Sequence, residues 1–475
     1  MKTTKMKSLL APLTIMLLTA CGAQNNITLS PAAGNCADGS VNASYCLGVT
    51  ILNNSGGQNW ITNTNFPISN LVLSVAGPSN VGYPTSSGSS FDPNNCLGSS
   101  ITPGGSCTFY LWLNGESAAV GTKPSVVVTA SYTINNTLFG GSSTTATSNV
   151  TVYETPSILM TSSTGSVESY NANGFAAPYT AESGETVVND TVNDGYYGFL
   201  YLAGNNGIYY SGNGTYIGNI TQTSSSVRGA SNLLLNNQTL YATPIGSLGS
   251  SVYSSALQGE SYSWQQYATG LTSVAANVST NNGSQLFFTQ SAAPNVYLCT
   301  SSSSSGNNCN QEGLAVPLAK TINALGFTNL GNMSGTPLTG LVAGANNGLW
   351  IESGTLGNSA NSWSQVGLSG GVISNPINQI VNDSSLNLYI VDSSNLFYEL
   401  PVNQWSGAKQ MTAWTLPSGT AVASMVFDNA GNQLFVATTS GVLYTCPVSA
   451  GCSLVGFSLL SSIFSLNLVT SLTVN

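Results

Sequence analysis

The chain has 475 residues, and only 5% of them are charged, against about 25% in an average soluble domain. Seven Lys and Arg stand against 16 Asp and Glu, so the formal net charge is −9, and cations this sparse exclude nucleic acid as a partner. The chain contains no His, which removes the commonest general base and most zinc sites, and it has no phosphate-binding or dinucleotide-binding glycine motif.

The first 20 residues have the three parts of a secretion signal. Three Lys residues precede the apolar stretch Leu9–Leu18, which is too short to span a bilayer. The segment ends in Leu18-Thr19-Ala20-Cys21, which resembles the lipobox of bacterial lipoproteins. In that family the Cys receives a diacylglycerol, cleavage frees it, and its amine is then acylated, for example with palmitate. The alternative is an ordinary secretion signal with an incidental Cys.

This resemblance implies that residues 1–20 form a signal peptide, that Cys21 is lipidated, and that residues 21–26 form a lipidated linker. Two or three acyl chains hold a protein stably on a membrane. Gly22 follows the Cys, where lipoproteins retained in the inner membrane carry Asp, so the resemblance implies the outer membrane, on its periplasmic or its exposed side. Without the signal, four basic residues remain against 16 acids, a formal charge of −12.

Eight further Cys residues lie in four close couples: Cys36 with Cys46, Cys96 with Cys107, Cys299 with Cys309, and Cys446 with Cys452. Eight Cys allow 105 connectivities, and proximity in an oxidising compartment favours pairing within each couple. Each short bridge would pin a hairpin or loop and contribute about 2 to 3 kcal/mol. A redox pair would be expected as C-x-x-C, which is absent.

Residues 27–154 contain short runs of β-branched and aromatic residues separated by Gly, Asn, Ser and Pro, which predict an all-β sandwich. The runs are Leu47–Leu52, Leu71–Ser74, Thr108–Leu113, Ser125–Ile134 and Ser148–Tyr153. The stretch from Cys96 through Ile101-Thr102-Pro103-Gly104-Gly105-Ser106-Cys107-Thr108 resembles the "C…L-x-P-G-x-S-C-T" signature of immunoglobulin-like domains of bacterial surface proteins, with Ile101 in place of Leu. The resemblance implies an immunoglobulin-like β-sandwich and says nothing of a ligand.

Thr155-Pro156 is interpreted as the joint to a second domain, residues 155–475, in which one unit recurs. The unit is an apolar strand, a polar turn, and a strand that opens with a small residue and an aliphatic one. The aliphatic positions are Val167, Ile208, Val252, Val296, Leu349, Leu396 and Val442, at intervals of 41 to 53 residues. This period predicts a seven-bladed β-propeller with four strands in each blade.

The end of the chain predicts how the ring closes. Leu271–Asn277 and Val422–Asp428 each precede a unit and are expected to be inner strands. Residues 469–475 repeat their pattern with no unit after them, whereas the first unit, 157–170, lacks such a strand before it. The C-terminal strand is therefore expected to complete the first blade and to remove two exposed sheet edges.

Catalytic chemistry would have to come from carboxylates. Glu182 with Glu185, and Asp190 with Asp194, are the close acid pairs, and all four are expected to be solvated loop acids. Asp383 and Asp428 follow strands in matching turns, where Asx turns are favoured over calcium binding because each loop offers one carboxylate. The single Arg, Arg228, excludes sialidase-type catalysis, which uses an arginine cluster. No catalytic residue, metal or cofactor is predicted.

Trp264, Trp363 and Trp405 each follow a repeat unit and sit beside Ser or Gln. A Trp in an outer strand normally packs between blades. If these rings instead lined one face, they would stack on sugars, which makes them candidate ligand-binding residues.

Together these features predict a non-catalytic binding or scaffold lipoprotein of the cell envelope. An immunoglobulin-like stalk would carry a propeller that recognises a protein or a glycan, with the membrane contacted through the N-terminal lipid and no nucleic acid bound. The alternative is a carboxylate-dependent glycosidase or polysaccharide lyase, which would need two acids within about 5 to 9.5 Å of each other.

Overall fold

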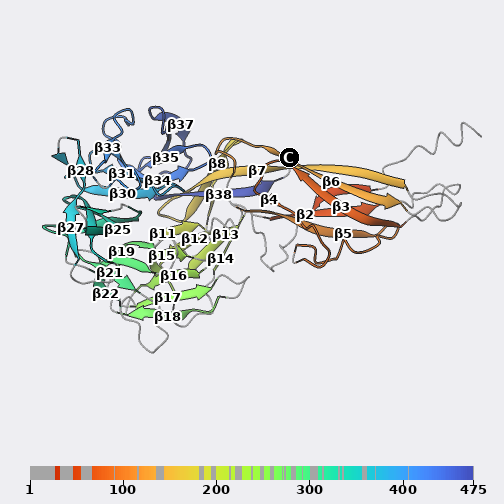
Figure 1. Ribbon diagram of the computed structural model, residues 1–475, viewed down its shortest axis with the longest axis horizontal. Coiled ribbons are helices and arrows are strands. Elements are labelled where there is room, and N and C mark those ends of the chain that lie inside the picture. Colours follow the sequence, from red (N-terminus) through yellow and green to blue (C-terminus); the bar gives the residue numbers. More distant parts are fainter. Residues whose placement is uncertain are drawn as a thin grey trace, which may run out of the picture.

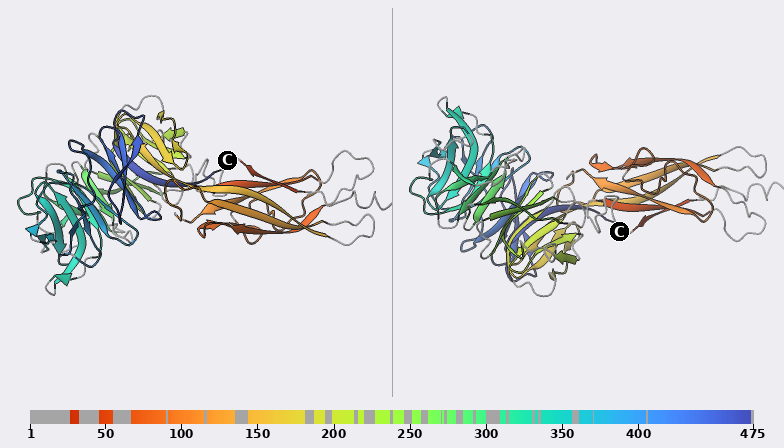
Figure 2. Two further views of the ribbon diagram at one scale, coloured as in Figure 1. Left: turned by 90° about the horizontal axis from the view of Figure 1, so that it is seen from above. Right: turned by 90° about the horizontal axis from the view of Figure 1, so that it is seen from below.

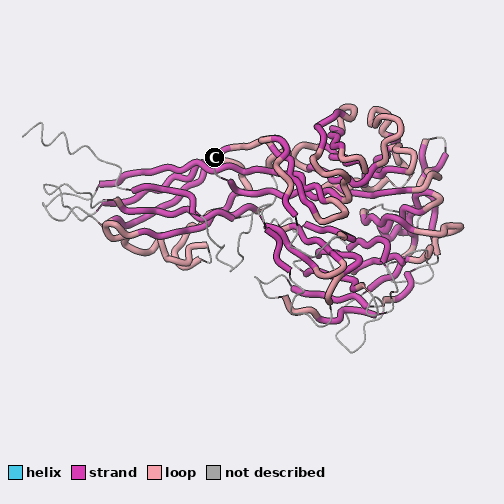
Figure 3. Tube along the Cα trace, turned by 180° about the vertical axis from the view of Figure 1, so that it is seen from behind, coloured by secondary structure: helices cyan, strands magenta, loops and turns pink. Residues whose placement is uncertain are grey.

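The structure is a computed structural model, and its described secondary structure consists entirely of β-strands and turns (Figure 3). It describes residues 27–32, 46–54, 67–89, 91–114, 117–134, 144–180, 187–193, 199–212, 216–219, 227–236, 239–245, 251–256, 262–269, 271, 274–279, 285–290, 293–299, 309–312, 315–329, 332–333, 336–355, 361–369, 371–404 and 406–473. The expected signal peptide and Cys21 lie outside these residues. Within them, no helix is long and apolar enough to cross a membrane.

The first part of the chain forms two antiparallel sheets packed face to face, here called the sandwich. One sheet has the order β1-β2-β5-β4, and the other contains the order β7-β6-β3. The bounds are β1 (Ile27–Ala32), β2 (Cys46–Asn53), β3 (Ile68–Ala76), β4 (Val81–Gly82), β5 (Ser106–Leu113), β6 (Ser125–Ile134) and β7 (Thr144–Thr161). Phe109 and Leu111 of one sheet share a core with Val126 and Val128 of the other. Strict alternation of buried and accessible residues along β6 gives its sheet one core face.

The two ends of the sandwich are distinguished by strand register. At one end, here called the tip, Ile27 pairs with Asn53, Leu52 with Ser106, and Ile134 with Thr144. At the other end, Val81 pairs with Leu113 and Ser125 with Tyr153. The first described residue, Ile27, therefore lies at the tip, and the rest of the molecule extends from the opposite end (Figures 1 and 2).

The remaining sheets form a closed ring of small antiparallel sheets (Figure 1). Their orders are β38-β7-β8-β10 with β9 on β8, then β11-β12-β13-β14, β15-β16-β17-β18, β19-β20-β21-β22, β23-β25-β26-β27 with β24 on β25, β30-β31-β32-β33 and β34-β35-β36-β37, and β28 pairs with β29. The first strands contact one another in sequence, from β11 through β15, β19, β23, β30 and β34 to β38, which contacts β11 again. The arrangement is propeller-like.

The bounds of the strands in the first half of the ring are β8 (Ser166–Asn171), β9 (Gly174–Phe175), β10 (Tyr179–Thr180), β11 (Val188–Asn193), β12 (Leu200–Gly204), β13 (Ile208–Gly212), β14 (Tyr216–Asn219), β15 (Ala230–Asn236), β16 (Thr239–Pro244), β17 (Ser251–Ala256), β18 (Gln265–Thr269), β19 (Val274–Ser279), β20 (Leu286–Gln290), β21 (Val296–Cys299) and β22 (Asn310–Glu312). Those in the second half are β23 (Ile322–Phe327), β24 (Asn332–Met333), β25 (Thr336–Ala345), β26 (Gly348–Ser353), β27 (Ser362–Gln365), β28 (Gly367–Leu368), β29 (Gly371–Val372), β30 (Ile377–Asn382), β31 (Leu388–Asp392), β32 (Phe397–Leu400), β33 (Lys409–Gln410), β34 (Val422–Asp428), β35 (Gln433–Thr438), β36 (Val442–Pro447), β37 (Ser453–Phe457) and β38 (Ser465–Thr473).

The ring closes through the C-terminal strand, as the sequence predicts. β38 pairs with β7 over nine residues, from Ser465 opposite Thr161 to Thr473 opposite Tyr153. Its other side meets β11, where the hydroxyl oxygens of Thr191 and Ser465 lie 2.6 Å apart. Asn467 donates to the Thr191 hydroxyl at 2.9 Å. β38 thereby completes the sheet that holds the first repeat unit.

Two of the predicted repeat positions shift by one residue. Ile208, Val252 and Leu349 are fully buried in the third strands of their sheets. Leu396, in contrast, is 37% exposed, and the buried residue is Phe397, which pairs with Val391. Leu443 likewise replaces Val442 as the buried residue, opposite Ala437. Both pairs are apolar doublets, so the register of the strands, and not the residue type, selects the buried member.

The predicted joint at Thr155-Pro156 lies within β7. This strand runs for 18 residues without a break, first beside β6 and then beside β38 and β8. The sandwich and the ring therefore share one continuous strand (Figure 1).

Candidate functional site

The ring has two ends, which the contacts of the sandwich tell apart. Asp428, the last residue of β34 before the turn to β35, accepts a hydrogen bond from the Val120 amide of the sandwich at 3.0 Å. Turns between first and second strands therefore lie on the sandwich side. β7 comes from the sandwich and ends at Thr161, so the turn that follows it lies at the opposite end. That end, which carries the turns between second and third strands and the connectors to the next sheet, is here called the distal face.

Exposed apolar side chains gather on the distal face. Among the described residues, ten large hydrophobic side chains are exposed, and seven of them lie there: Val187, Ile245, Leu318, Val372, Leu396, Phe457 and Leu459. The most exposed are Leu318, at 94%, and Leu459, at 71%. They come from turns and connectors of several different sheets, so they mark this face but do not make up one contiguous patch.

A hollow of about 580 Å³ opens on this face between the turn at Ser394–Phe397 and the connector at Gln410–Gly419. It is here called the distal hollow. Its thirteen lining residues are all uncharged, and they combine amides and hydroxyls such as Asn395 and Thr412 with apolar side chains such as Leu396 and Met411. Because burying an unpaired charge is costly, this lining favours an uncharged ligand group.

The turn beside the hollow is fixed by one buried carboxylate. Asp392, the last residue of β31, accepts hydrogen bonds from the amides of Ser394 and Leu396 at 2.8 and 2.9 Å through Oδ1. Asn395 adopts a left-handed conformation with a φ of 59°. Its side chain donates to the carbonyl of Thr420 at 2.6 Å. The turn is thereby tied to the connector across the hollow.

The floor of the hollow is equally rigid. Trp414 is only 2% exposed, and its indole N–H donates to the carbonyls of Pro447 and Ala450, both at 3.0 Å. The Met411 amide donates to the carbonyl of Phe397 at 2.8 Å. Behind the turn, Tyr398 donates its hydroxyl to Asp392 at 3.0 Å, and burial together with the Asp392 charge raises the pKa of this phenol. The hollow is therefore preformed, and its neighbouring phenol stays protonated.

Side chains on the first strands bind neighbouring sheets together around the axis of the ring. Six of these strands, all except β38, have a register shift near their start, as between Val188 and Asp190, which is a β-bulge. At the bulge, Asn189 donates to the carbonyl of Ala230 at 2.9 Å, and the matching Asn323 donates to that of Ile377 at 3.0 Å. The inner ring is thus held largely by neutral amides.

Asp190 is the charged exception in this inner ring. Its carboxylate accepts hydrogen bonds from the amides of Leu233 at 2.7 Å and Thr191 at 2.8 Å. Protein encloses the carboxyl group, although other atoms of the residue remain accessible to solvent. This burial raises the pKa of the carboxyl group to about 7, even though the two amide donors act to lower it. Asp190 therefore joins two sheets and titrates near neutral pH.

The other predicted acids have structural roles or lie outside the described residues. Asp383 accepts from the amide and the side chain of Asn387, at 2.9 and 2.8 Å, and Asp428 accepts from the Gly431 amide at 2.8 Å. Both carboxylates bind within the turns that follow their strands, but their amide donors lie four and three residues further on, instead of the two residues of an Asx turn. Glu182, Glu185 and Asp194 are outside the described residues. No group of three or more metal-ligating side chains occurs in the described part of the chain.

The two candidate Trp residues that the structure describes, Trp264 and Trp363, pack against different core clusters. Trp363 is 7% exposed and packs in one core cluster with Phe287 and Leu325, which is the packing between sheets that a Trp in an outer strand normally has. Trp264 is half-buried against a different cluster. Trp405 lies outside the described residues. The sequence gives no signal for the distal hollow, because its lining residues belong to a turn and a connector, whereas the repeat pattern marks strands.

Three of the four predicted disulfides are present. Cys96 is bonded to Cys107, Cys299 to Cys309, and Cys446 to Cys452, with Cα–Cα distances of 5.7, 4.3 and 4.0 Å. The second and third bridges span the β21–β22 and β36–β37 hairpins, as expected for staples across outer strands. Cys46 is disulfide-bonded, and its predicted partner Cys36 lies outside the described residues.

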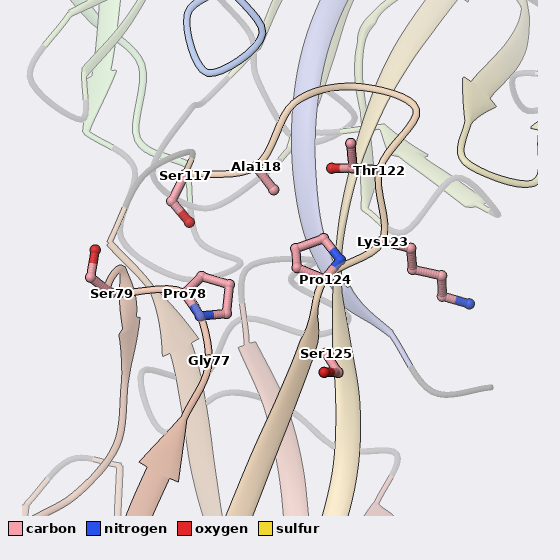
Figure 4. Close-up of a pocket in the computed structure, with 9 residues that line it drawn as sticks. All are labelled: Gly77, Pro78, Ser79, Ser117, Ala118, Thr122, Lys123, Pro124 and Ser125. Carbon is pink, nitrogen blue, oxygen red and sulfur yellow. The ribbon is translucent and has the colours of Figure 1, made fainter.

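A second, shallower hollow of about 770 Å³ lies at the joint, between Gly77–Ser79 and Ser117–Ser125 (Figure 4). The Lys123 side chain points away from it. The Ser117 hydroxyl is already bonded to the buried Glu154 at 2.9 Å. This hollow belongs to the contact between the sandwich and the ring, and the distal hollow is the better candidate for a ligand.

No protein-family model matches the chain, and no curated protein matches it. Among solved structures, the chain is similar to a putative 6-phosphogluconolactonase from Bacteroides uniformis, with 12% identity and a TM-score of 0.46 over 66% of this chain and 99% of the other. It is also similar to YCF48 bound to D1 peptide, with 11% identity and a TM-score of 0.46 over 60% and 86% of the two chains. At these scores the likeness assigns no family and no activity to this chain.

Proposed function

We propose that this protein is an outer-membrane lipoprotein that binds a protein or glycan of the cell envelope without catalysis. An immunoglobulin-like sandwich, residues 27–154, is the stalk, and a seven-bladed propeller, residues 155–475, presents the distal face. The continuous ring of first strands and the Cys96–Cys107 bridge at the start of β5 support these assignments.

The placement of the tip and the distal face at opposite ends of the molecule carries the proposal. Ile27 lies at the tip of the sandwich, and the distal face lies at the other end of the molecule. Only five residues separate Cys21 from Ile27, so a lipid on Cys21 would hold the tip within about 20 Å of the membrane. The distal hollow would then point away from the anchoring membrane, towards other components of the envelope.

The chemistry of the distal face supports binding over catalysis. The hollow has an uncharged lining and apolar residues at its rim. Asp392, the carboxylate next to it, is fully buried, and its two oxygens receive four hydrogen bonds, from the amides of Ser394 and Leu396, the side chain of Asn375, and the hydroxyl of Tyr398. A neutral polar surface of this kind fits a sugar or an uncharged protein segment.

The test uses the lipid-free chain, residues 22–475, on a glycan array and in pull-downs from envelope extracts. Leu396→Asp places a charge at the rim of the hollow and should weaken binding at least about tenfold, that is by about 1.4 kcal/mol. The matched control is Leu454→Asp, an exposed residue on β37, which should leave binding unchanged. Equal effects of the two substitutions, or no binding to either panel by a folded chain, would refute recognition through the hollow.

The anchor is tested separately. Cys21→Ala should abolish incorporation of labelled palmitate and release the protein from membrane pellets, because the acyl chains provide the anchorage. Retention of the label in this variant would place the lipid elsewhere and remove the basis for the orientation.

A further inference from the structure

We infer that the sandwich and the propeller form a single rigid arm, which holds the distal face about 60 Å from the tip. The partner is therefore a component that stands off from the anchoring membrane. The statement about the partner rests on the proposed function, whereas the rigidity of the arm rests on contacts at the joint alone.

Two strands pass through the joint side by side. The joint residues Thr155 and Pro156 of β7 pair with Ser471 and Thr470 of β38. The hydroxyls of Thr155 and Thr473 are 2.8 Å apart. β38 also reaches into the sandwich, where Leu472 is buried in its core cluster. A ladder of two strands resists bending more than a single linker would, because bending breaks hydrogen bonds on one side.

A loop from the sandwich adds a third connection. This loop, residues 117–124 and here called the clasp, inserts Val120 into a core cluster of the ring beside Ile158, Phe435 and Leu466. Val120 is 7% exposed, and its amide donates to Asp428 as described above. The clasp thus fixes the joint at a point away from the two through strands.

The clasp is itself held by a buried carboxylate. Glu154 of β7 is fully buried, and its Oε1 accepts hydrogen bonds from the amides of Ser117 and Ala118 at 3.1 and 3.2 Å. Oε2 accepts from the Ser117 hydroxyl at 2.9 Å, and Asn80 donates to Oε1 at 3.3 Å. Because a buried carboxylate is costly without such donors, the four bonds keep Ser117 and Ala118 in place. Figure 4 shows these two residues at the start of the clasp.

The length of the arm follows from β7. This strand begins at the tip with Thr144 and ends at the distal face with Thr161. Eighteen residues at about 3.3 Å each span roughly 60 Å. The distal face therefore lies beyond the reach of lipids in the anchoring membrane.

Rigidity is tested by pulsed electron spin resonance on the lipid-free chain, with spin labels at Ser106, at the tip, and Leu318, on the distal face. The labels are attached through a non-natural ketone residue because the native cysteines form disulfides. The wild-type arm should give one narrow distance peak. Val120→Ser should at least double its width, and Val72→Ser, an exposed position on β3, should not. If Val120→Ser fails to fold, Val120→Ala replaces it.

Several peaks in the wild-type chain would overturn the rigid arm, and an unchanged width in a folded Val120 variant would overturn the role of the clasp. This measurement needs neither lipid nor partner, so its failure is distinct from failure of the proposed function. The stand-off is then measured in vesicles that carry the lipidated protein and acceptor lipids. Energy transfer should be strong from Ser106 and weak from Leu318, and equal transfer from both sites would overturn the proposal.

Discussion

The carboxyl group of Asp190 makes the stability of the inner ring depend on pH. Its pKa is raised to about 7 by burial, so the folded chain binds this proton more tightly than the unfolded chain, for which the ordinary value is 3.8. Its contribution to stability is fully present below about pH 4 and is lost as the pH rises to about 7.

We therefore expect the free energy of unfolding of the wild type to fall, relative to that of Asp190→Asn, between pH 4 and 8. The difference should change by at most about 1.4 kcal/mol per pH unit. Urea unfolding of both proteins at several pH values measures this difference. If the unfolding free energies of the two proteins change in parallel with pH, Asp190 does not titrate in this range.

Substitutions at Trp363 distinguish a role in packing from a role in ligand binding. Its ring is buried among residues of two neighbouring sheets, so Trp363→Ala should lower the free energy of unfolding by about 3 to 5 kcal/mol. Trp363→Phe keeps most of the packing and should cost less. A Trp363→Ala variant of unchanged stability that loses glycan binding would restore the stacking role.

Residue types predicted some of these roles and could not predict others. The sequence marks Asp383 and Asp428 as turn residues, because the donors to their carboxylates are close neighbours in the sequence. Asp190, two residues into β11, gave no such signal, since its partner Leu233 lies on another sheet. The sequence gives no signal for Asp392 either, although the turn that this carboxylate caps forms one side of the distal hollow.

Among the elements, β38 has the clearest consequence. Deleting residues 465–475 would expose the edges of β7 and β11 and remove nine residue pairs. We expect the truncated chain to lose cooperative unfolding and to aggregate, since open strand edges pair with other chains. Removing only residues 474–475, which follow β38, is the control. Thermal unfolding and size-exclusion chromatography distinguish the results, and a soluble, cooperatively folding truncation would contradict ring closure by this strand.

The sequence predicts a strand well where its pattern of apolar and polar residues reflects which side chains are buried. Alternation located β5 and β6, and the repeat located the third strands of the ring. The pattern could not choose between Leu396 and Phe397, because both are apolar and only pairing with β31 decides. Nor could it show that β7 continues through Thr155-Pro156, since a Thr-Pro pair ends many strands and only the neighbouring β38 supports this one.

At the scale of the whole molecule, the joint makes the sandwich and the ring one cooperative unit. We expect a single calorimetric transition for the chain, because unfolding either part would expose Leu472 or Val120. Val120→Ser should weaken this coupling and separate the transition into two, whereas Val72→Ser should leave one. Two transitions already present in the wild type would show that the parts unfold independently.

The place of β38 in the chain also sets an order of events, because it follows β7 and all the other strands of the ring. During synthesis, neither the ring nor the joint can form until β38 has left the ribosome. A chain that terminates before β38 keeps open edges on β7 and β11, however well its other sheets fold. Pairing of β38 thus hides the edges by which proteases and chaperones would recognise a chain that lacks this strand.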